Sequence, residues 1–86
     1  MKIPIINVPQ TGANINSLRK KANLSVKNIQ KVFKFETPQA IYKWIHGRNL
    51  PTVDNLIILA EIFGVTIEDI LSIDYIEINE ETNNYV

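Results

Sequence analysis

The most informative part of the chain is residues 25–51, which read SVKNIQKVFKFETPQAIYKWIHGRNLP. Ser25 is a favourable N-cap, and after it apolar side chains recur at three- and four-residue spacing with lysines between them. This pattern is typical of a helix that lies on a core with its basic side in water. The apolar face is expected to consist of Val26, Ile29, Val32 and Phe33. The helix should end in a turn at Phe35-Glu36.

A second helix follows in the same segment. Thr37 is expected to cap it, with Pro38 at its first position, where a missing N–H costs nothing. Gly47 lies just past its expected end, so the helix should span about residues 37–46. Its inward face is expected to consist of Ala40, Ile41, Trp44 and Ile45. Trp44 is therefore predicted to be a core residue rather than a stacking platform.

Three further helices are predicted around this pair. Thr11 can cap one of them, and Thr52 can cap another that has Asp54 in its first turn, where a negative charge suits the helix dipole. Thr66, with Asp69 three residues later, forms a variant capping box and opens a short last helix. The pattern predicts an all-α domain of five short helices.

The two ends of the chain differ from the helical part. Residues 2–8 and 73–78 are rich in isoleucine with partial two-residue alternation, so each could form a short strand. The two segments could pair with one another, pair with a second copy of the chain, or remain unpaired. The polar residues 79–86 are expected to be disordered. The chain is thus divided into an extended segment over 1–11, the five-helix domain over 12–72 and an acidic segment over 73–86.

The charges are separated along the chain, although their formal sum over 86 residues is zero. All nine lysines and arginines precede residue 51 together with a single acid, Glu36, whereas the other eight acids follow. The first part therefore carries +8 and the second −8. Such asymmetry indicates a polyanionic partner for the basic part, or an acidic tail.

The composition argues against disulfide-rich and membrane proteins. No cysteine is present, so neither a disulfide framework nor a thiolate metal site is possible, which fits a reducing compartment. The longest apolar run, residues 56–60, is far shorter than the ~20 residues that cross a bilayer. The apolar start is interrupted by Pro4, Asn7 and Pro9. Neither a membrane anchor nor a signal peptide is expected.

No catalytic motif can be assembled from the sequence. A Ser-His-Asp set, a phosphate-binding glycine loop and a pair of carboxylates in a cleft are all missing from it. His46 is the only histidine and has no second candidate ligand, so we expect it at a helix end near phosphate rather than in a metal site. We therefore expect no enzyme, no cofactor and no metal.

One set of residues is spaced as in a known family. The set comprises Gly12, Ile15, Leu18-Arg19, Leu24-Ser25, Ile29, Ile41, Trp44, Gly47, Pro51, Leu56, Ala60, Phe63-Gly64-Val65 and Ile70-Leu71. With it, residues 12–72 resemble the helix-turn-helix domain of lambda-repressor-like (Cro/repressor-type, xenobiotic-response-element) transcriptional regulators. The resemblance implies a helix that lies in the DNA major groove. It also implies a cytoplasmic, nucleoid-associated protein of bacterial or phage-like type.

Four features depart from the family pattern. The turn at residues 34–36 is one residue longer and lacks the usual glycine. Gln30 replaces a small alanine, and Val26 replaces a polar residue that often touches phosphate. Ile45 stands where an acid commonly pairs with the arginine of the first helix, so Arg19 lacks the partner that the family supplies.

The resemblance assigns DNA contacts to two groups of residues. Base edges would be read from the exposed side of the second helix, at Thr37, Pro38, Gln39, Tyr42 and Lys43. A glutamine can pair with adenine and a lysine with guanine, each good bidentate pair being worth about 1–3 kcal/mol of discrimination, whereas Pro38 can make only apolar contact. Phosphates would be held at Ser25, Lys27, Arg48 and Asn49.

The expected function is that of a sequence-specific DNA-binding transcriptional regulator. One such domain buries too little surface for tight specific binding, so a homodimer is expected on palindromic double-stranded DNA, with half-sites about 10 bp apart. The dimer surface could use the last two helices or residues 73–78. Two alternatives remain open. One is an antitoxin or adaptor whose acidic C-terminal part binds a protein partner, and the other is a helix-turn-helix scaffold that no longer binds DNA.

Overall fold

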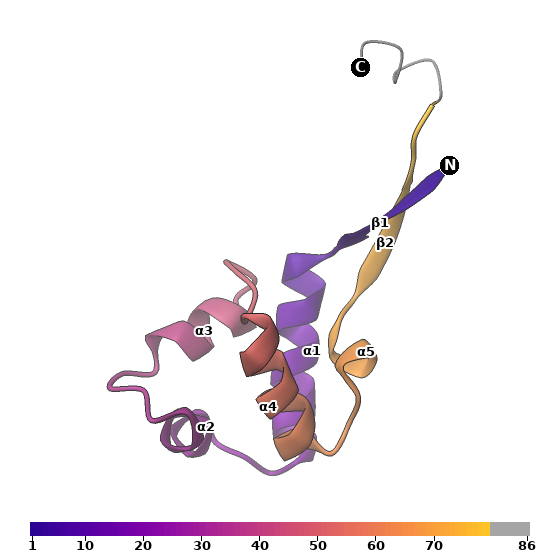
Figure 1. Ribbon diagram of the computed structural model, residues 1–86. Coiled ribbons are helices and arrows are strands. Elements are labelled where there is room, and N and C mark those ends of the chain that lie inside the picture. The colour runs from indigo at the N-terminus through magenta and orange to yellow at the C-terminus, as the bar shows by residue number, and fades with distance from the viewer. Residues whose placement is uncertain (80–86) are drawn as a thin grey trace.

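Five helices with a strand at either end make up residues 1–79, the part of the chain that the computed structural model describes (Figure 1). The helices are α1 (Val8–Lys21), α2 (Val26–Phe33), α3 (Gln39–Ile45), α4 (Val53–Phe63) and α5 (Ile67–Ile70), and the strands are β1 (Lys2–Ile6) and β2 (Ile73–Glu77). None of these helices is long and apolar enough to cross a bilayer. The predicted five-helix class with short terminal strands is confirmed. Residues 80–86, within the segment expected to be disordered, lie outside the described residues.

The core takes one fully buried aliphatic side chain from each helix. These side chains, all 0% exposed, are Ile15 of α1, Ile29 of α2, Ile41 of α3, Leu59 of α4 and Ile70 of α5. Burying a side chain of this size stabilises the fold by about 1.5–3 kcal/mol. Val32, predicted to lie inward, is instead 48% exposed, since Ile29 and Phe33 already occupy the side of α2 that meets the core. Packing on one shared centre therefore sets the position of α3 relative to α2.

An aromatic cluster connects the turn between α2 and α3 to this core. Trp44 meets Phe33 and Phe35 edge to face, with ring centroids 5.5 Å and 6.0 Å apart. Phe33 and Phe35 stack on each other at 5.1 Å. Aromatic pairs of this kind contribute about 0.5–1.5 kcal/mol beyond their burial. Trp44 is thus a core residue, as predicted, and Phe35 anchors the turn from which α3 departs.

The turn itself closes without a glycine. Lys34 adopts the left-handed conformation (φ 58°), which costs a non-glycine residue about 1–2 kcal/mol. The side-chain amide of Gln30 donates to the carbonyl of Phe35 (3.2 Å), and the Phe35 N–H donates back to the carbonyl of Gln30 (3.1 Å). These two hydrogen bonds offset the cost. The glutamine that departs from the family pattern therefore holds the longer turn closed.

Helix α1 begins earlier than the sequence analysis predicts. Asn7 is its N-cap, and the Asn7 side chain accepts a hydrogen bond from the Gln10 N–H (2.9 Å). Residues 8–11 are therefore helical, which corrects the assignment of 1–11 to an extended segment. Thr11, predicted to cap the helix, is fully buried within it, and its hydroxyl accepts from the Ser72 N–H (3.0 Å). Instead of capping the helix, Thr11 therefore connects α1 to the residue that precedes β2.

Helix α3 begins later than predicted. It starts at Gln39, with Pro38 at the N-cap position, and the carbonyl of Pro38 accepts the first helical hydrogen bond from the Tyr42 N–H (3.1 Å). Thr37 precedes the helix, and no side chain caps its start. The prediction of a helix over 37–46 capped by Thr37 is wrong at this end, because the N-cap lies one residue later at Pro38 (φ −84°, ψ 6°), which places Thr37 outside the helix.

Helices α1 and α3 cross in close contact at Gly12. A Cβ added to Gly12 would lie 2.2 Å from the carbonyl oxygen of Trp44, so a larger residue would force the helices apart. Gly47, after α3, has φ +70°, and a Cβ there would lie 2.6 Å from the Cα of Pro9. The end of α3 and the loop that follows it, including Arg48, are thereby fixed on α1.

Arg19 has a structural partner despite the loss of the acid that the family supplies. Its Nε and Nη2 donate to Asn16 Oδ1 (3.2 and 2.9 Å), and its Nη1 donates to the carbonyl of Leu24 (2.9 Å). The guanidinium therefore ties the end of α1 to the loop that leads into α2. The apolar Ile45 is compatible with this arrangement because Arg19 needs no carboxylate.

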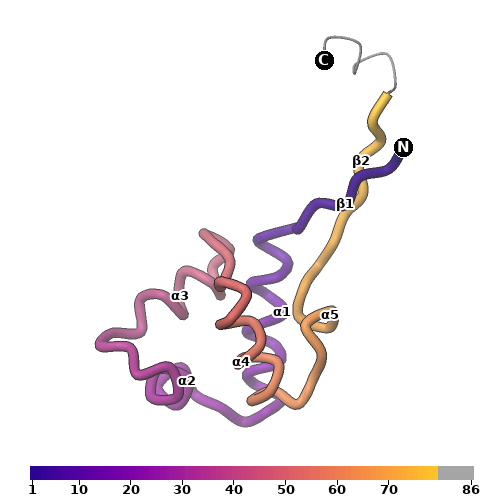
Figure 2. The backbone as a smooth tube through the Cα atoms, viewed as in Figure 1, coloured from indigo at the N-terminus to yellow at the C-terminus, as the bar shows by residue number. Residues whose placement is uncertain are grey.

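The two terminal strands pair with each other. β1 and β2 form an antiparallel two-stranded sheet, in register from Lys2 opposite Glu77 to Ile6 opposite Ile73. Of the three arrangements that the sequence leaves open, this is the one found. The resulting ribbon projects away from the helical body, with the N-terminus at its far end (Figure 2).

Candidate nucleic-acid interface

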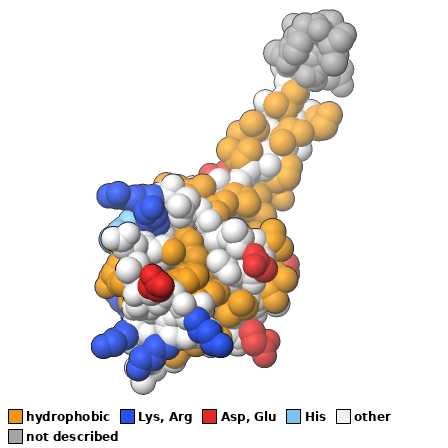
Figure 3. Space-filling model, turned by 60° about the vertical axis from the view of Figure 1, so that its left-hand side comes forward, with side chains coloured by type: hydrophobic (Ala, Val, Ile, Leu, Met, Phe, Trp, Pro, Cys, Tyr) orange, Lys and Arg blue, Asp and Glu red, His pale blue; other side chains and the backbone are white. Residues whose placement is uncertain are grey.

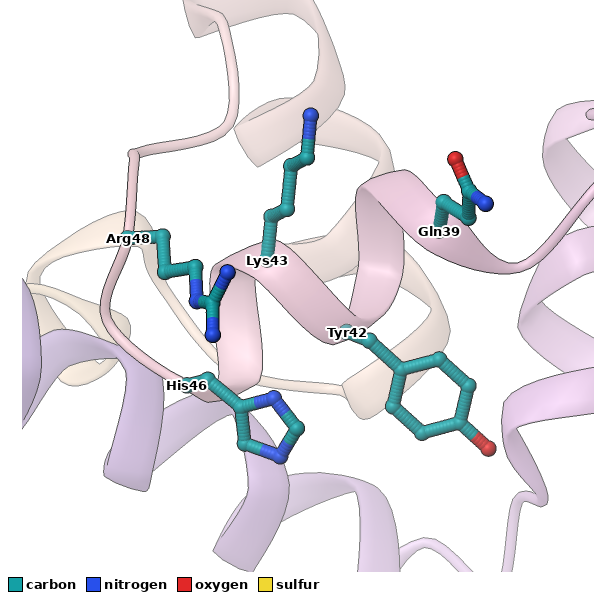
Figure 4. A pocket seen from close by; sticks show the side chains of 5 residues that line it. All are labelled: Gln39, Tyr42, Lys43, His46 and Arg48. Atoms are coloured by element: carbon teal, nitrogen blue, oxygen red, sulfur yellow. The ribbon is translucent and has the colours of Figure 1, made fainter.

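The exposed side of α3 and the loop after it form a shallow hollow of about 290 Å³. The side chains that line it are Gln39, Tyr42, Lys43, His46 and Arg48. The first four recur at three- and four-residue spacing, which places them on one face of the helix. In Figure 4 the side chains of Gln39 and Lys43 point one way from α3 and those of Tyr42 and His46 the other, while Arg48 extends from the loop that follows the helix. Four residues that the sequence selects as DNA contacts are thus brought together in one surface.

His46 is a lining residue that the sequence analysis places only at a helix end. Its imidazole stacks on the phenol ring of Tyr42, with centroids 6.0 Å apart and an interplanar angle of 19°. The four-residue spacing from Tyr42, on the exposed side of the same helix, is the sequence signal that could have identified it. No group of three metal-binding side chains occurs within residues 1–79. The stacked pair gives the hollow a flat aromatic wall.

The other predicted base-contact residues, Thr37 and Pro38, lie just before α3. Neither belongs to the hollow. Thr37 is exposed and Pro38 is half-buried at the N-cap of the helix. They therefore border the hollow at the N-terminal end of α3 rather than lining it.

The start of α2 carries the expected phosphate ligands Ser25 and Lys27. The Ser25 N–H donates to Asn28 Oδ1 (2.9 Å), and the Asn28 N–H donates to Ser25 Oγ (3.0 Å), which forms a complete capping box. The backbone N–H of Ser25 is therefore already used inside the protein. Its hydroxyl proton, the N–H groups of the first turn other than that of Asn28, and the exposed Lys27 remain for an anion. Asn49 is also exposed, in the loop beyond the hollow.

The basic side chains of the helical body are not neutralised by acids. Within residues 1–79 the single ion pair joins the N-terminal ammonium to Glu77, at 3.1 Å, and no lysine or arginine side chain takes part in one. In the view of Figure 3 the lysines and arginines lie over the helical body, whereas hydrophobic side chains cover most of the ribbon. The positive charge near α2 and α3 is thus available to an external polyanion.

The beginning of α4 carries a fixed negative charge. Thr52, predicted to cap this helix, makes no such hydrogen bond to the backbone; its hydroxyl instead donates to the carboxylate of Asp54. This hydrogen bond lowers the pKa of Asp54 below its ordinary value. The negative charge of Asp54 in the first turn complements the positive end of the helix dipole.

Comparison with known proteins places this fold in a family. A family model described as Helix-turn-helix matches residues 15–70. Two solved structures of the BldD DNA-binding domain, one of them from S. venezulae, superpose on the chain with a TM-score of 0.64 at 22% identity. The superposition covers 77% of this chain and 94% or 97% of those domains. No curated protein sequence matches. The chain belongs to the helix-turn-helix family of the Cro and repressor type.

Proposed function

We propose that this protein is a sequence-specific DNA-binding regulator of transcription that reads the major groove with α3. The observation that carries the proposal is the hollow on α3, where hydrogen-bonding and cationic side chains converge on one exposed surface and form no ion pair with an acid within residues 1–79. Family membership supports the same function, and the BldD structures of the same fold are described as DNA-binding domains. We infer a regulator rather than an enzyme.

The size of α3 suits the groove that it would enter. An α-helix with its side chains is about 10–12 Å in diameter. The major groove of B-DNA is about 12 Å wide and displays a distinct set of hydrogen-bonding groups for each base pair. A short helix fixed by Gly12 and Gly47 can therefore be inserted as a rigid element.

Specificity would come from Gln39, the first residue of α3, and Lys43, one turn later on the exposed face. The Gln39 amide can bond both N6 and N7 of adenine, and the Lys43 ammonium can reach O6 and N7 of guanine. Thr37 and Pro38 would border this contact at the N-terminal end, where the Pro38 ring could meet a thymine methyl. Tyr42, held by its stack on His46, would contact the neighbouring bases or backbone.

Affinity would come from contacts to phosphate on either side of α3. Ser25 and Lys27 would hold one strand through a hydroxyl, backbone N–H groups and an ammonium at the start of α2. Arg48 and Asn49 would hold the backbone from the loop after α3. Because each cation displaced from DNA contributes to the salt dependence, this clamp makes binding steeply sensitive to ionic strength.

The same reasoning favours a dimer on DNA. A single small domain buries about 600–1,000 Å² of protein surface, at the low end for specific complexes. Two copies on a palindromic operator, with half-sites about 10 bp apart, would double the contacts while preserving the two-fold symmetry of the site.

Selection of bound sequences from a randomised DNA library tests the proposal. The wild-type protein should enrich a palindrome, and Gln39→Ala should relax the base preference at one position in each half-site, a loss of about 1–3 kcal/mol of discrimination. Arg48→Ala is the matched control, because loss of a phosphate contact should weaken binding evenly without changing the preferred sequence. Equal effects of the two variants would refute this division of roles. Deletion of residues 73–86 tests the adaptor function. Loss of a protein partner with operator binding unchanged would favour that function instead.

A further inference from the structure

The ribbon of β1 and β2 lacks a core of its own. All five residues of β2 are exposed, and large apolar side chains cover both faces of the ribbon. The exposed fractions are 43% for Ile5, 40% for Ile6, 43% for Ile73, 64% for Tyr75 and 43% for Ile76. An isolated two-stranded sheet is marginally stable in water, and three or more strands are normally needed. The ribbon therefore has the composition of a sheet that is completed by another strand.

The register shows which backbone groups of the ribbon point outward. The Asn7 N–H donates to the carbonyl of Ser72, and the Ile78 N–H donates to the carbonyl of Met1, each at 2.8 Å. Since hydrogen-bonded and non-hydrogen-bonded pairs alternate in an antiparallel ladder, odd-numbered residues of β1 bond to even-numbered residues of β2. The N–H and C=O groups of Ile73, Tyr75 and Glu77 therefore face away from β1.

The two outer edges of the ribbon differ in their capacity to pair. On β1 the outward residues are Lys2, Pro4 and Ile6, and Pro4 at the middle has no N–H to donate. A proline at this place blunts an edge strand. On β2 every outward residue retains its N–H and its C=O, and no strand within residues 1–79 covers that edge. The ribbon thus has one closed edge and one open edge.

We propose that the open edge of β2 pairs antiparallel with β2 of a second copy of this chain, giving a four-stranded sheet in the order β1-β2-β2-β1. This pairing would form the interface of the dimer inferred above. Only its role on DNA rests on the proposed function. Antiparallel pairing of identical edges is self-complementary, as a two-fold interface requires. Because Pro4 closes each outer edge, the assembly stops at two chains.

Charge selects the position of the two-fold axis along β2. An axis at Asp74 would bring two carboxylates face to face, which is unfavourable. An axis at Tyr75 pairs Ile73 with Glu77 and Asp74 with Ile76 of the partner chain, and it uses all five residues of the strand. Glu77 already forms an ion pair with the N-terminal ammonium, at 3.1 Å, which offsets its charge beside the second copy. The axis therefore passes through Tyr75.

Proline substitution at the axis tests the proposal without breaking the ribbon. Tyr75→Pro removes an N–H that points outward, so the bonds between β1 and β2 are kept, while Tyr75→Val removes the same side chain and leaves the N–H in place. The molar mass of the full chain, measured by light scattering over a concentration series, should be that of two chains for the wild type and for Tyr75→Val. For Tyr75→Pro it should fall twofold, to the 9.8 kDa of one chain. Unchanged Trp44 fluorescence and helical circular dichroism would show that the body is folded.

A second variant examines the closed edge independently. Pro4→Thr restores an outward N–H to β1, and it should yield species larger than two chains that increase with concentration. The competing surface is the apolar side of α4, where Val53 is 71% and Ile57 is 55% exposed. A monomeric wild type, a Tyr75→Pro protein that stays dimeric, or an Ile57→Lys protein that becomes monomeric would each overturn the proposal. These measurements contain no DNA, so a failure of DNA binding would leave their outcome unaffected.

Discussion

The helical body and the β ribbon differ in how far they bury their apolar side chains. In the body, one aliphatic residue from each of the five helices within residues 1–79 is fully buried, and the aromatic cluster closes the remaining side. In the ribbon, four of the isoleucines are 40–43% exposed (Ile5, Ile6, Ile73 and Ile76), and within residues 1–79 no helix packs extensively on either strand. The body therefore buries its apolar side chains within one chain, whereas the ribbon leaves apolar side chains and one strand edge uncovered within residues 1–79.

Charge follows the same division. The body carries cations that no acid neutralises within residues 1–79, on and around α3. The ribbon carries the single ion pair of the described chain, between its N-terminus and Glu77. Unused positive charge suits a polyanion, whereas apolar faces and a free strand edge suit another protein chain. The two regions thus differ in kind, and we propose the first as the DNA-facing surface and the second as the interface with a second copy.

Truncation of one isoleucine in each region should give the largest difference in the free energy of unfolding. Ile41→Ala opens a cavity at the centre of the body and should lower the free energy of unfolding by about 2–5 kcal/mol. Ile76→Ala, the same substitution on the exposed ribbon, should cost less than about 1 kcal/mol. Urea unfolding monitored by Trp44 fluorescence, at a concentration where the protein is monomeric, measures both. Similar losses from the two variants would contradict the separation of body and ribbon.

Removal of a helix cap should have a smaller effect, confined to the body. Ser25→Ala breaks the capping box with Asn28 at the start of α2 and should cost about 1 kcal/mol. Ser17→Ala, at an exposed position inside α1, is the matched control and should be neutral or slightly stabilising, because alanine is the better helix former. Thermal unfolding of the two variants compares them. A cost for Ser17→Ala as large as that for Ser25→Ala would mean that capping is not the cause.

The smallest expected effect concerns one carboxyl of the body. Thr52→Val removes the hydroxyl that holds the pKa of Asp54 below its ordinary value, so the pKa should rise toward that value. A lowered pKa stabilises the native state above the pKa of the unfolded chain, and this contribution is lost as the pH falls through the native value. NMR titration of the Asp54 side chain measures the change. No rise in the variant would show that Thr52 is not the cause.

The sequence predicted those features that depend on near neighbours. The N-cap at Ser25 and the capping box at Thr66 are encoded within a few residues, and the structure has both. Features that depend on distant residues were not predictable in this way. Thr11 is a good N-cap by type, but its hydroxyl is used by the Ser72 N–H, and the helix starts at Asn7 instead.

The candidate site was predictable to a similar extent. The resemblance to the family assigned Gln39, Tyr42 and Lys43 to the exposed face of one helix, and the structure brings them together. The inclusion of His46 depends on where α3 ends, and that of Arg48 on a loop held against α1 by Gly47. Loop conformations of this kind are set by packing between elements that lie far apart in sequence.

The most direct test of the DNA-facing body is the salt dependence of binding to random duplex DNA. Affinity should fall steeply as salt rises, and Arg48→Ala should lower the slope of log affinity against log salt by about one. Lys2→Ala removes one positive charge from the ribbon and should leave the slope unchanged. The absence of affinity at low salt, or an equal change of slope in both variants, would contradict the account.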